Sequence, residues 1–151
     1  MQNFRAHTNR LPHWRVDAAT YHVIWRLSPT QVHGLQPRER TLVQSALRFF
    51  DGLRYELIAH AVMDDHVHVV VRPFQGFPLE RAVQSWKGFT GRKLKDNARA
   101  WPVWQKDYFD RIVRDERDWA ETVAYVLFNP DAKWQECSRY AWSDSVGEWD
   151  L

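Results

Sequence analysis

Two histidines stand two positions apart in a short apolar run, residues 64–72, with the sequence DDHVHVVVR. Alternate side chains of a β-strand point to the same face, so His66 and His68 share one face and Val67 points to the other. Two neighbouring imidazoles can bind one metal ion, each through one ring nitrogen. The same spacing also fits two partly exposed strand histidines without a ligand, so other parts of the chain must decide between the two interpretations.

A tyrosine and an asparagine one helical turn apart form a second candidate group. Residues 116–129 carry apolar side chains at helical spacing, and we expect this helix to stop before Pro130, because proline disfavours helix at the preceding residue. Tyr125 and Asn129 are i and i+4 neighbours on the polar side of this helix. Such a tyrosine is usually an ordinary surface residue. Beside an amide oxygen, it could instead attack a phosphate while Asn129 reaches the metal bound by the histidines.

The elements that must position these residues follow in the order strand, helix, strand, strand, helix, strand. β-branched and aromatic runs predict the strands, and apolar residues at helical spacing predict the helices. Asp64-Asp65 supplies a tight turn that makes the second and third strands a hairpin. The order is that of a ferredoxin-like split βαβ, so we expect an α+β fold with an antiparallel sheet, helices on one face and a site on the other. The expected strands are residues 20–27, 54–63, 64–72 and 108–113, and the expected helices are residues 38–52, 79–96 and 116–129.

Length and composition fit an ordinary globular protein. The 151 residues are 44% hydrophobic and 26% charged, so we expect a single domain over residues 1–151, with a core at about 20–130 and the tail 131–151 packed on it. The formal charge of +2 is small for a protein that coats duplex DNA. A single cysteine, Cys137, excludes an intrachain disulfide, and no apolar run approaches a membrane span. We therefore expect a cytoplasmic protein with no membrane partner.

Basic residues gather in the second half of the expected helix 79–96. A run of charge is usually only a solvated face, but this run adjoins a candidate site for phosphate chemistry, so we interpret its members as DNA phosphate contacts. They are Lys87, Arg92, Lys93, Lys95 and, just beyond the helix, Arg99. The aromatic residues Trp101 and Trp104 could stack on unpaired bases, although a role in the core is at least as common. The basic, irregular residues 1–19 could be solvated or could form an arm that contacts a DNA strand.

The combination of HVH on a strand with YxxxNP on a helix resembles the single-tyrosine HUH transposases, and in particular the REP-associated tyrosine transposases. The resemblance extends from about Tyr21 to Trp142 and includes the segments YHVIWRL, VMDDHVHVVVRP, WKGFTGRKLK, VWQKDYFDRIVRDE and AYVLFNP. In this family the residue between the two histidines is hydrophobic, and Val67 fits. One departure is Asp64-Asp65, where many members have Pro-Asn or Pro-Glu before the first histidine.

The resemblance implies a ferredoxin-like fold and a set of roles for particular residues. His66, His68 and Asn129 would bind a divalent ion, Mg²⁺ or Mn²⁺, and Tyr125 would be the nucleophile. The implied activity is cleavage and rejoining of hairpin-bearing single-stranded DNA through a covalent 5′-phosphotyrosine, by a monomer or a homodimer. Tyr108 is a second candidate nucleophile, ranked lower because it is expected on a strand without a ligand partner at i+4.

Two other functions compete with strand transfer. One is a metal-dependent phosphohydrolase that uses the histidine pair with bound water, and the other is a hairpin-binding protein without catalysis. A histidine-triad hydrolase is excluded, because it needs a further histidine two residues after His68, where the chain has Val70. A covalent protein–DNA adduct would distinguish strand transfer from both alternatives.

Overall fold

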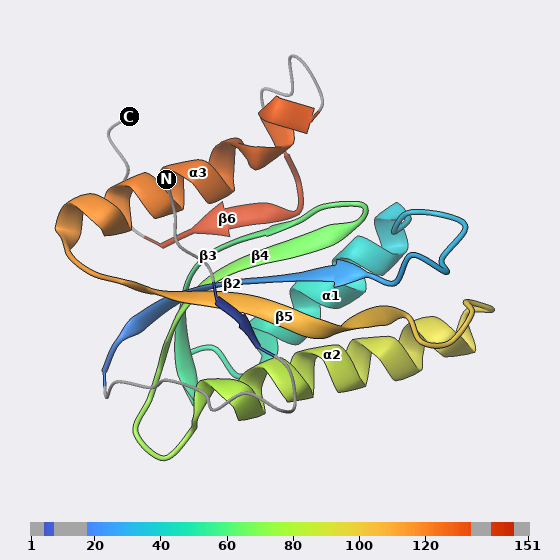
Figure 1. The fold of residues 1–151 in the computed structure, drawn as a ribbon, viewed down its shortest axis with the longest axis horizontal. Helices are drawn as coiled ribbons and strands as arrows, with labels where there is room; N and C mark the ends of the chain where they lie inside the picture. The colour runs from blue at the N-terminus through green and yellow to red at the C-terminus, as the bar shows by residue number, and fades with distance from the viewer. Residues whose placement is uncertain (1–4, 8–17, 134–139, 147–151) are drawn as a thin grey trace.

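A computed structural model describes residues 5–7, 18–133 and 140–146, which form a six-stranded sheet and three helices (Figure 1). The strands are β1 (Arg5–His7), β2 (Thr20–Leu27), β3 (Tyr55–Val62), β4 (His66–Pro73), β5 (Trp104–Val113) and β6 (Ser143–Ser145), and the helices are α1 (Pro37–Phe49), α2 (Leu79–Asp96) and α3 (Glu116–Lys133). None of these three helices combines the length and the apolar character that a bilayer crossing requires. Most of the proposed N-terminal arm, and Cys137, lie outside the described residues.

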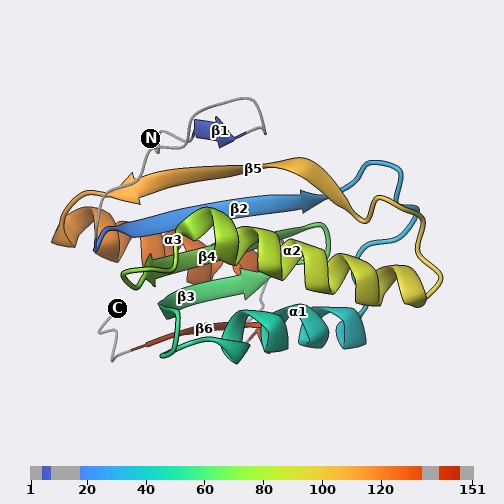
Figure 2. The same ribbon diagram turned by 90° about the horizontal axis from the view of Figure 1, so that it is seen from below.

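The four central strands have the order of the predicted fold. Across the sheet the strands follow β1-β5-β2-β4-β3-β6, and every neighbouring pair is antiparallel (Figure 2). The central order β5-β2-β4-β3 inserts β4 between β2 and β3, which is the ferredoxin-like arrangement of a split βαβ unit. The predicted α+β class, antiparallel sheet and hairpin between β3 and β4 are therefore confirmed.

Strand β4 contributes to two separate cores, because its side chains alternate between the two faces of the sheet. Val67 and Val71 are fully buried in the larger core, on the face that α1 and α2 cover (Figure 2). Val70 belongs to a smaller core on the opposite face, together with Val123 and Val126 of α3. We call this second face, which also carries His66 and His68, the histidine face.

The expectation that the helices cover only one face is correct for α1 and α2 but wrong for α3, which lies across the histidine face (Figure 1). The reason lies in β3. Its side chains Ile58 and Ala61, and Met63 just beyond it, are buried on the histidine face, while Leu57 and Val62 are buried on the other. A strand that is apolar on both faces must be covered on both. The site therefore lies between α3 and the sheet rather than on an open surface.

Two element boundaries differ by four residues from those predicted, and the other differences are smaller. β5 begins at Trp104 rather than at residue 108, because Trp104 is buried and pairs with Leu27, which extends the ladder with β2. α3 continues to Lys133 with Pro130 inside it. Proline removes the backbone hydrogen bond that residue 130 would donate, but Val126 and Pro130 are both buried, and this burial holds the last turns on the domain.

The described part of the C-terminal tail packs on β3 and α1. Residues 143–145 form the edge strand β6, which pairs with β3. The Tyr140 hydroxyl donates to the carbonyl oxygen of Val62 at 2.5 Å, and the Trp142 indole donates to Thr41 Oγ1 at 3.0 Å. Other tail positions, including Trp134 and Trp149, lie outside the described residues.

A buried chain of hydrogen bonds joins β3 to both helices of the larger core. Trp86 Nε1 of α2 donates to the Tyr55 hydroxyl at 3.0 Å, and this hydroxyl donates to the carbonyl oxygen of Leu47 in α1 at 2.6 Å. We expect Tyr55→Phe to lower the free energy of unfolding by about 2 kcal/mol, because it leaves a buried indole N–H and a buried carbonyl without their partner.

Urea unfolding followed by circular dichroism measures this loss. The matched control is Tyr125→Phe, which removes the hydroxyl of a tyrosine that is 49% exposed and should change stability by less than about 0.5 kcal/mol. Equal unfolding midpoints for the two variants would show that the Tyr55 hydroxyl does not stabilise the core.

Candidate active site on the histidine face

The two histidines occupy the start of β4 on the face that α3 covers. β4 pairs with β2 so that His66 lies opposite Arg26 and His68 lies opposite Ile24. His68 is 2% exposed, whereas His66 is partly exposed at the end of the sheet. Their ring centroids are 4.8 Å apart and the rings are nearly perpendicular, at 79°. The pair thus extends from the protein interior to the sheet end.

Helix α3 brings Tyr125 and Asn129 to this pair. Asn129 Oδ1 lies 3.1 Å from His66 Nε2. The Tyr125 ring is edge-on to the His68 ring at a centroid distance of 5.6 Å, and its side chain is about half exposed. Two motifs that are about sixty residues apart in the sequence therefore meet at one place. A large bound ligand can therefore reach the Tyr125 side chain, whereas His68 is buried beside it.

The first half of the polar side of α3 faces the sheet rather than solvent. Asp118 and Thr122 share this side with the two site residues of α3, and both contact Arg111 of β5. Asp118 accepts hydrogen bonds from Arg111 at 2.8 and 2.9 Å, and the Thr122 hydroxyl accepts another from the same guanidinium. These hydrogen bonds lower the pKa of Asp118 to about 2, against the smaller effect of its partial burial. The ion pair fixes α3 on β5 about two turns before Tyr125.

Each histidine of the pair has its Nδ1 occupied by a neighbouring side chain. His66 Nδ1 lies 2.6 Å from Asp65 Oδ1, and it donates the hydrogen bond because a carboxylate can only accept one. His68 Nδ1 lies 3.0 Å from Nε2 of His22, which is on β2. Nε2 is therefore the ring nitrogen that either histidine can offer to a ligand.

Burial keeps the inner histidines neutral. Burial, together with a smaller effect of the nearby Arg111, lowers the pKa of His22 to about 3. Burial also lowers the pKa of His68 well below its usual range, with smaller effects from His22 and His66. A metal ion binds the neutral form of imidazole, so His68 need not lose a proton at neutral pH before it binds one.

Two polar atoms of this site have a spacing that suits the ligands of a divalent ion. Neighbouring ligands of an octahedral ion, each at about 2.1 Å, are about 3 Å apart, and His66 Nε2 and Asn129 Oδ1 are 3.1 Å apart. Both atoms are suitable ligands, because the Asn129 amide oxygen carries lone pairs and, with Nδ1 donating to Asp65, Nε2 is the remaining ring nitrogen of His66. No three His, Cys, Asp or Glu side chains in the described part of the chain are arranged to hold an ion.

Two further residues of β2 belong to this face and were not predicted as site residues. Alternation in the expected strand 20–27 does place His22 and Arg26 on one face. Local sequence patterns do not show, however, that this strand pairs with β4, so they could not place these two residues beside the histidine pair. Arg26 is exposed and directly opposite His66. It adds a positive charge at the rim of the site.

The predicted phosphate contacts of α2 differ in how exposed their side chains are. Arg92, Lys93 and Lys95 are exposed and available to a ligand. Lys87 instead joins α2 to β5, because its Nζ donates to two carbonyl oxygens of that strand at 2.7 and 3.0 Å. Burial lowers the pKa of Lys87 to about 8. Its ammonium group is therefore engaged within the protein.

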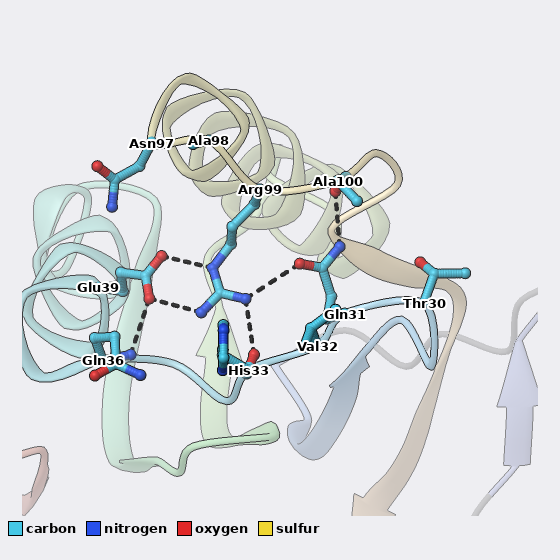
Figure 3. Close-up of a pocket in the computed structure, with 10 residues that line it drawn as sticks. All are labelled: Thr30, Gln31, Val32, His33, Gln36, Glu39, Asn97, Ala98, Arg99 and Ala100. Atoms are coloured by element: carbon cyan, nitrogen blue, oxygen red, sulfur yellow. Dashed lines mark hydrogen bonds and ion pairs between the residues drawn. The ribbon is translucent and has the colours of Figure 1, made fainter.

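Arg99, the fifth predicted phosphate contact, is a structural residue (Figure 3). Its guanidinium donates to both carboxylate oxygens of Glu39, at 2.6 and 2.7 Å. It also donates to Gln31 Oε1 and to the carbonyl oxygens of His33 and Gly34. All five N–H groups are therefore used, and the side chains of Arg99 and Glu39 are only 9% and 5% exposed. No donor remains for a phosphate.

The aromatic candidates also differ in their surroundings. Trp104 is a core residue, 5% exposed, whose indole donates to Thr90 Oγ1 at 2.9 Å. Trp101 is 60% exposed, and Lys95 Nζ lies 5.6 Å from its ring centre. Tyr108 is buried in the larger core, on the opposite face from the histidine pair. Of the two candidate nucleophiles, only Tyr125 is on the histidine face.

Known proteins share both the sequence pattern and the fold. A family model described as "Transposase IS200 like" matches residues 15–127, most of the chain. The fold is similar to that of a REP-associated tyrosine transposase bound to a REP hairpin, with a TM-score of 0.75 and 16% identity over 90% of this chain and 82% of that one. It is also similar to a candidate transposase from Deinococcus radiodurans R1, with a TM-score of 0.52 and 22% identity over 78% of this chain and 95% of that one. No curated protein matches the sequence.

The buried ion pair of Arg99 predicts a specific pattern of stability. We expect Arg99→Ala to lower the free energy of unfolding by about 3 to 5 kcal/mol, because the variant leaves the Glu39 carboxylate buried without its cation. Adding Glu39→Gln should recover much of the loss, since the double variant no longer buries an unpaired charge.

Urea unfolding of the single and double variants measures both effects. Arg92→Ala is the control, because Arg92 is exposed and its loss should cost less than about 0.5 kcal/mol. If Arg99→Ala is as stable as Arg92→Ala, Arg99 does not stabilise the fold.

Proposed function

The chain belongs to the IS200-like transposase family, and we propose that it cleaves and rejoins single-stranded DNA through a covalent 5′-phosphotyrosine on Tyr125. One observation carries the proposal: a half-exposed tyrosine lies beside a histidine pair and an amide oxygen on the same face. Family membership supports a DNA-processing role, and the geometry supports the separate roles of Tyr125 as nucleophile and of the histidines and Asn129 as metal ligands.

Tyr125 would supply the nucleophile. Its oxygen attacks the scissile phosphorus in line with the 3′ oxygen, so the bond from Tyr125 Oη to phosphorus forms as the P–O3′ bond breaks. The phenolic proton passes to solvent, and the leaving 3′ oxygen takes up a proton. No water is consumed, and the phosphotyrosine keeps the energy of the broken bond. A second 3′-OH can then reverse the step and join two strands.

His66, His68 and Asn129 would hold a divalent ion, Mg²⁺ or Mn²⁺. When bound, such an ion polarises a non-bridging oxygen of the scissile phosphate and orients it. Imidazole nitrogens suit transition ions better than Mg²⁺, which prefers oxygen ligands, so Mn²⁺ is the better ion for experiments. The protein's own contribution is to hold three donor atoms in place: β4 fixes the two histidines, and α3 fixes Asn129.

The proposed substrate is single-stranded DNA that carries a hairpin. Support for the hairpin comes from the structural relative with a REP hairpin bound. Support for the single strand comes from the site, because α3 lies across the histidine face and a duplex would bring a second backbone that must be displaced. The net charge of +2 also suits a short single-stranded track better than broad duplex wrapping.

The exposed cations indicate a path for this strand. Arg26 stands opposite His66 at the end of the sheet. The basic end of α2 reaches the same end, because Arg99 joins it to Gly34 and the neighbouring Leu35 N–H donates to the Asp64 carbonyl at 2.6 Å. A strand that leaves the site past Arg26 would therefore meet the exposed cations of α2 on the far side of the sheet.

Covalent capture of DNA tests the proposal. A hairpin oligonucleotide with a single-stranded flank, labelled at its 3′ end, is incubated with protein and Mn²⁺ and separated on a denaturing gel. We expect a labelled protein band for the wild type and none for Tyr125→Phe, which should still bind the hairpin with an affinity within about twofold of wild type because little shape is lost. Tyr108→Phe is the control and should form the adduct.

Other outcomes of this experiment identify the alternatives. An adduct that persists in Tyr125→Phe assigns the nucleophile to another residue. Cleaved DNA without any adduct in the wild type indicates a metal-dependent phosphohydrolase. Binding without cleavage indicates a hairpin-binding protein.

Salt dependence tests the proposed path over α2. We expect replacement of Arg92, Lys93 and Lys95 together by Gln to reduce the slope of log K against log salt by about 2 to 3 units, since each lost phosphate contact removes about 0.7 to 0.9 units. Fluorescence anisotropy of a labelled, flanked hairpin measures the slope. Arg48→Gln is the control, because Arg48 lies at the C-terminal end of α1 and pairs with Asp144 at 3.2 Å. A slope equal to that of wild type would place the DNA elsewhere.

A further inference from the structure

His22 is a buried histidine with no role in the chemistry described so far. It is 0% exposed, and its Nε2 lies 3.0 Å from His68 Nδ1. The two rings stack with centroids 5.3 Å apart at 29°, and the Tyr125 ring is edge-on to His22 at 6.1 Å. His22 therefore contacts both the inner histidine and the tyrosine from behind the site.

Hydrogen bonding between two neutral imidazoles needs one hydrogen between the two nitrogens, and it can come from either ring. If His22 Nε2 donates, the neutral His68 ring carries its own hydrogen on Nε2 and has no lone pair to offer a metal. If His68 Nδ1 donates, its Nε2 is a free lone pair directed into the site. The capacity of His68 to act as a ligand thus depends on which ring donates.

Asp65 settles the same question for His66, because a carboxylate can only accept a hydrogen bond from His66 Nδ1. The two partners differ in their surroundings. The Asp65 side chain is 55% exposed, so water can replace it. His22 is fully buried, so no water can take over its hydrogen bond to His68.

We propose that His22 is the positioning residue of His68: its Nε2 accepts the hydrogen from His68 Nδ1 and so holds the His68 Nε2 lone pair toward the metal-binding position. This inference rests on the proposed function, because it assigns His68 a metal-ligand role. A partner on the second ring nitrogen of a ligand histidine typically changes metal affinity by about 10- to 100-fold when it is removed.

Substitutions of His22 test whether a hydrogen-bond acceptor must stand at the position of its Nε2, or whether any polar side chain is enough. The Oε1 of glutamine can stand close to the position of histidine Nε2, whereas the side chain of asparagine is one methylene shorter. We expect His22→Asn and His22→Phe to weaken Mn²⁺ binding by about 10- to 100-fold and His22→Gln to stay within about threefold of wild type. Electron paramagnetic resonance of free Mn²⁺ measures the affinity without DNA or turnover.

His60 provides the matched control. It is another buried histidine, 2% exposed, whose Nε2 lies 2.9 Å from Gln44 Nε2, on the side of β3 that faces α1. His60→Asn should lower the thermal unfolding midpoint as His22→Asn does, but it should leave Mn²⁺ affinity unchanged. Equal losses of affinity in both variants, or none in any His22 variant, would overturn the assignment.

Nitrogen chemical shifts of the wild type give a second readout that needs no variant. ¹⁵N NMR should show the His68 hydrogen on Nδ1 with Nε2 unprotonated, and a hydrogen on Nε2 would overturn the assignment even if every His22 variant fails to fold. A wild type that binds no Mn²⁺ overturns this inference together with the metal site. A wild type that binds Mn²⁺ and forms the DNA adduct, but whose His22 variants bind Mn²⁺ normally, overturns the role of His22 alone.

Discussion

Side-chain alternation in β4 is the constraint on which the rest of the structure depends. Its valines at positions 67, 69 and 71 are fully buried beneath α1 and α2, and the residues between them must then point to the other face. Moving the register by one residue would exchange the two sets and put the histidines in the larger core. The burial of three valines thus fixes where His66 and His68 point. Because β3 is apolar on both faces, α3 has to cover the same side.

The layer between α3 and the sheet holds polar groups beside its apolar core, and these polar groups occur mainly in pairs. Arg111 holds Asp118, and His22 holds His68, at distances of 2.8 to 3.0 Å. Buried polar groups need such partners, because an unpaired one loses its hydration without compensation. These contacts fix α3 and the inner histidine before any ligand binds. The contact between His66 Nε2 and Asn129 Oδ1, at 3.1 Å, differs because both of its atoms can act as metal ligands. That contact is where an added cation would stabilise the arrangement.

Local spacing was enough to predict the fold class and the two residue pairs, whereas the expectation that the pairs share one site came from the family resemblance. The HxH spacing places His66 and His68 on one strand face, and the i, i+4 spacing places Tyr125 and Asn129 on one helix face, as the structure shows. Local spacing could not reveal tertiary partners. Arg99 was interpreted as a DNA contact, yet it pairs with Glu39, sixty residues away in the chain. His22 was overlooked for the same reason, since its partner His68 is 46 residues away. The position of α3 was also predicted wrongly, because β3 is buried on both faces of the sheet and strand alternation alone does not show this.

The central claim is that Tyr125 carries the DNA in a covalent intermediate, and peptide mapping by mass spectrometry tests it most directly. Wild-type protein is incubated with a flanked hairpin and Mn²⁺, the DNA is trimmed with nuclease, and the protein is digested with a protease. We expect a nucleotide phosphate on the peptide that contains Tyr125, attached to that residue in the fragment spectrum. A nucleotide on Tyr108 or on any other residue, or cleaved DNA without a modified peptide, would contradict the claim.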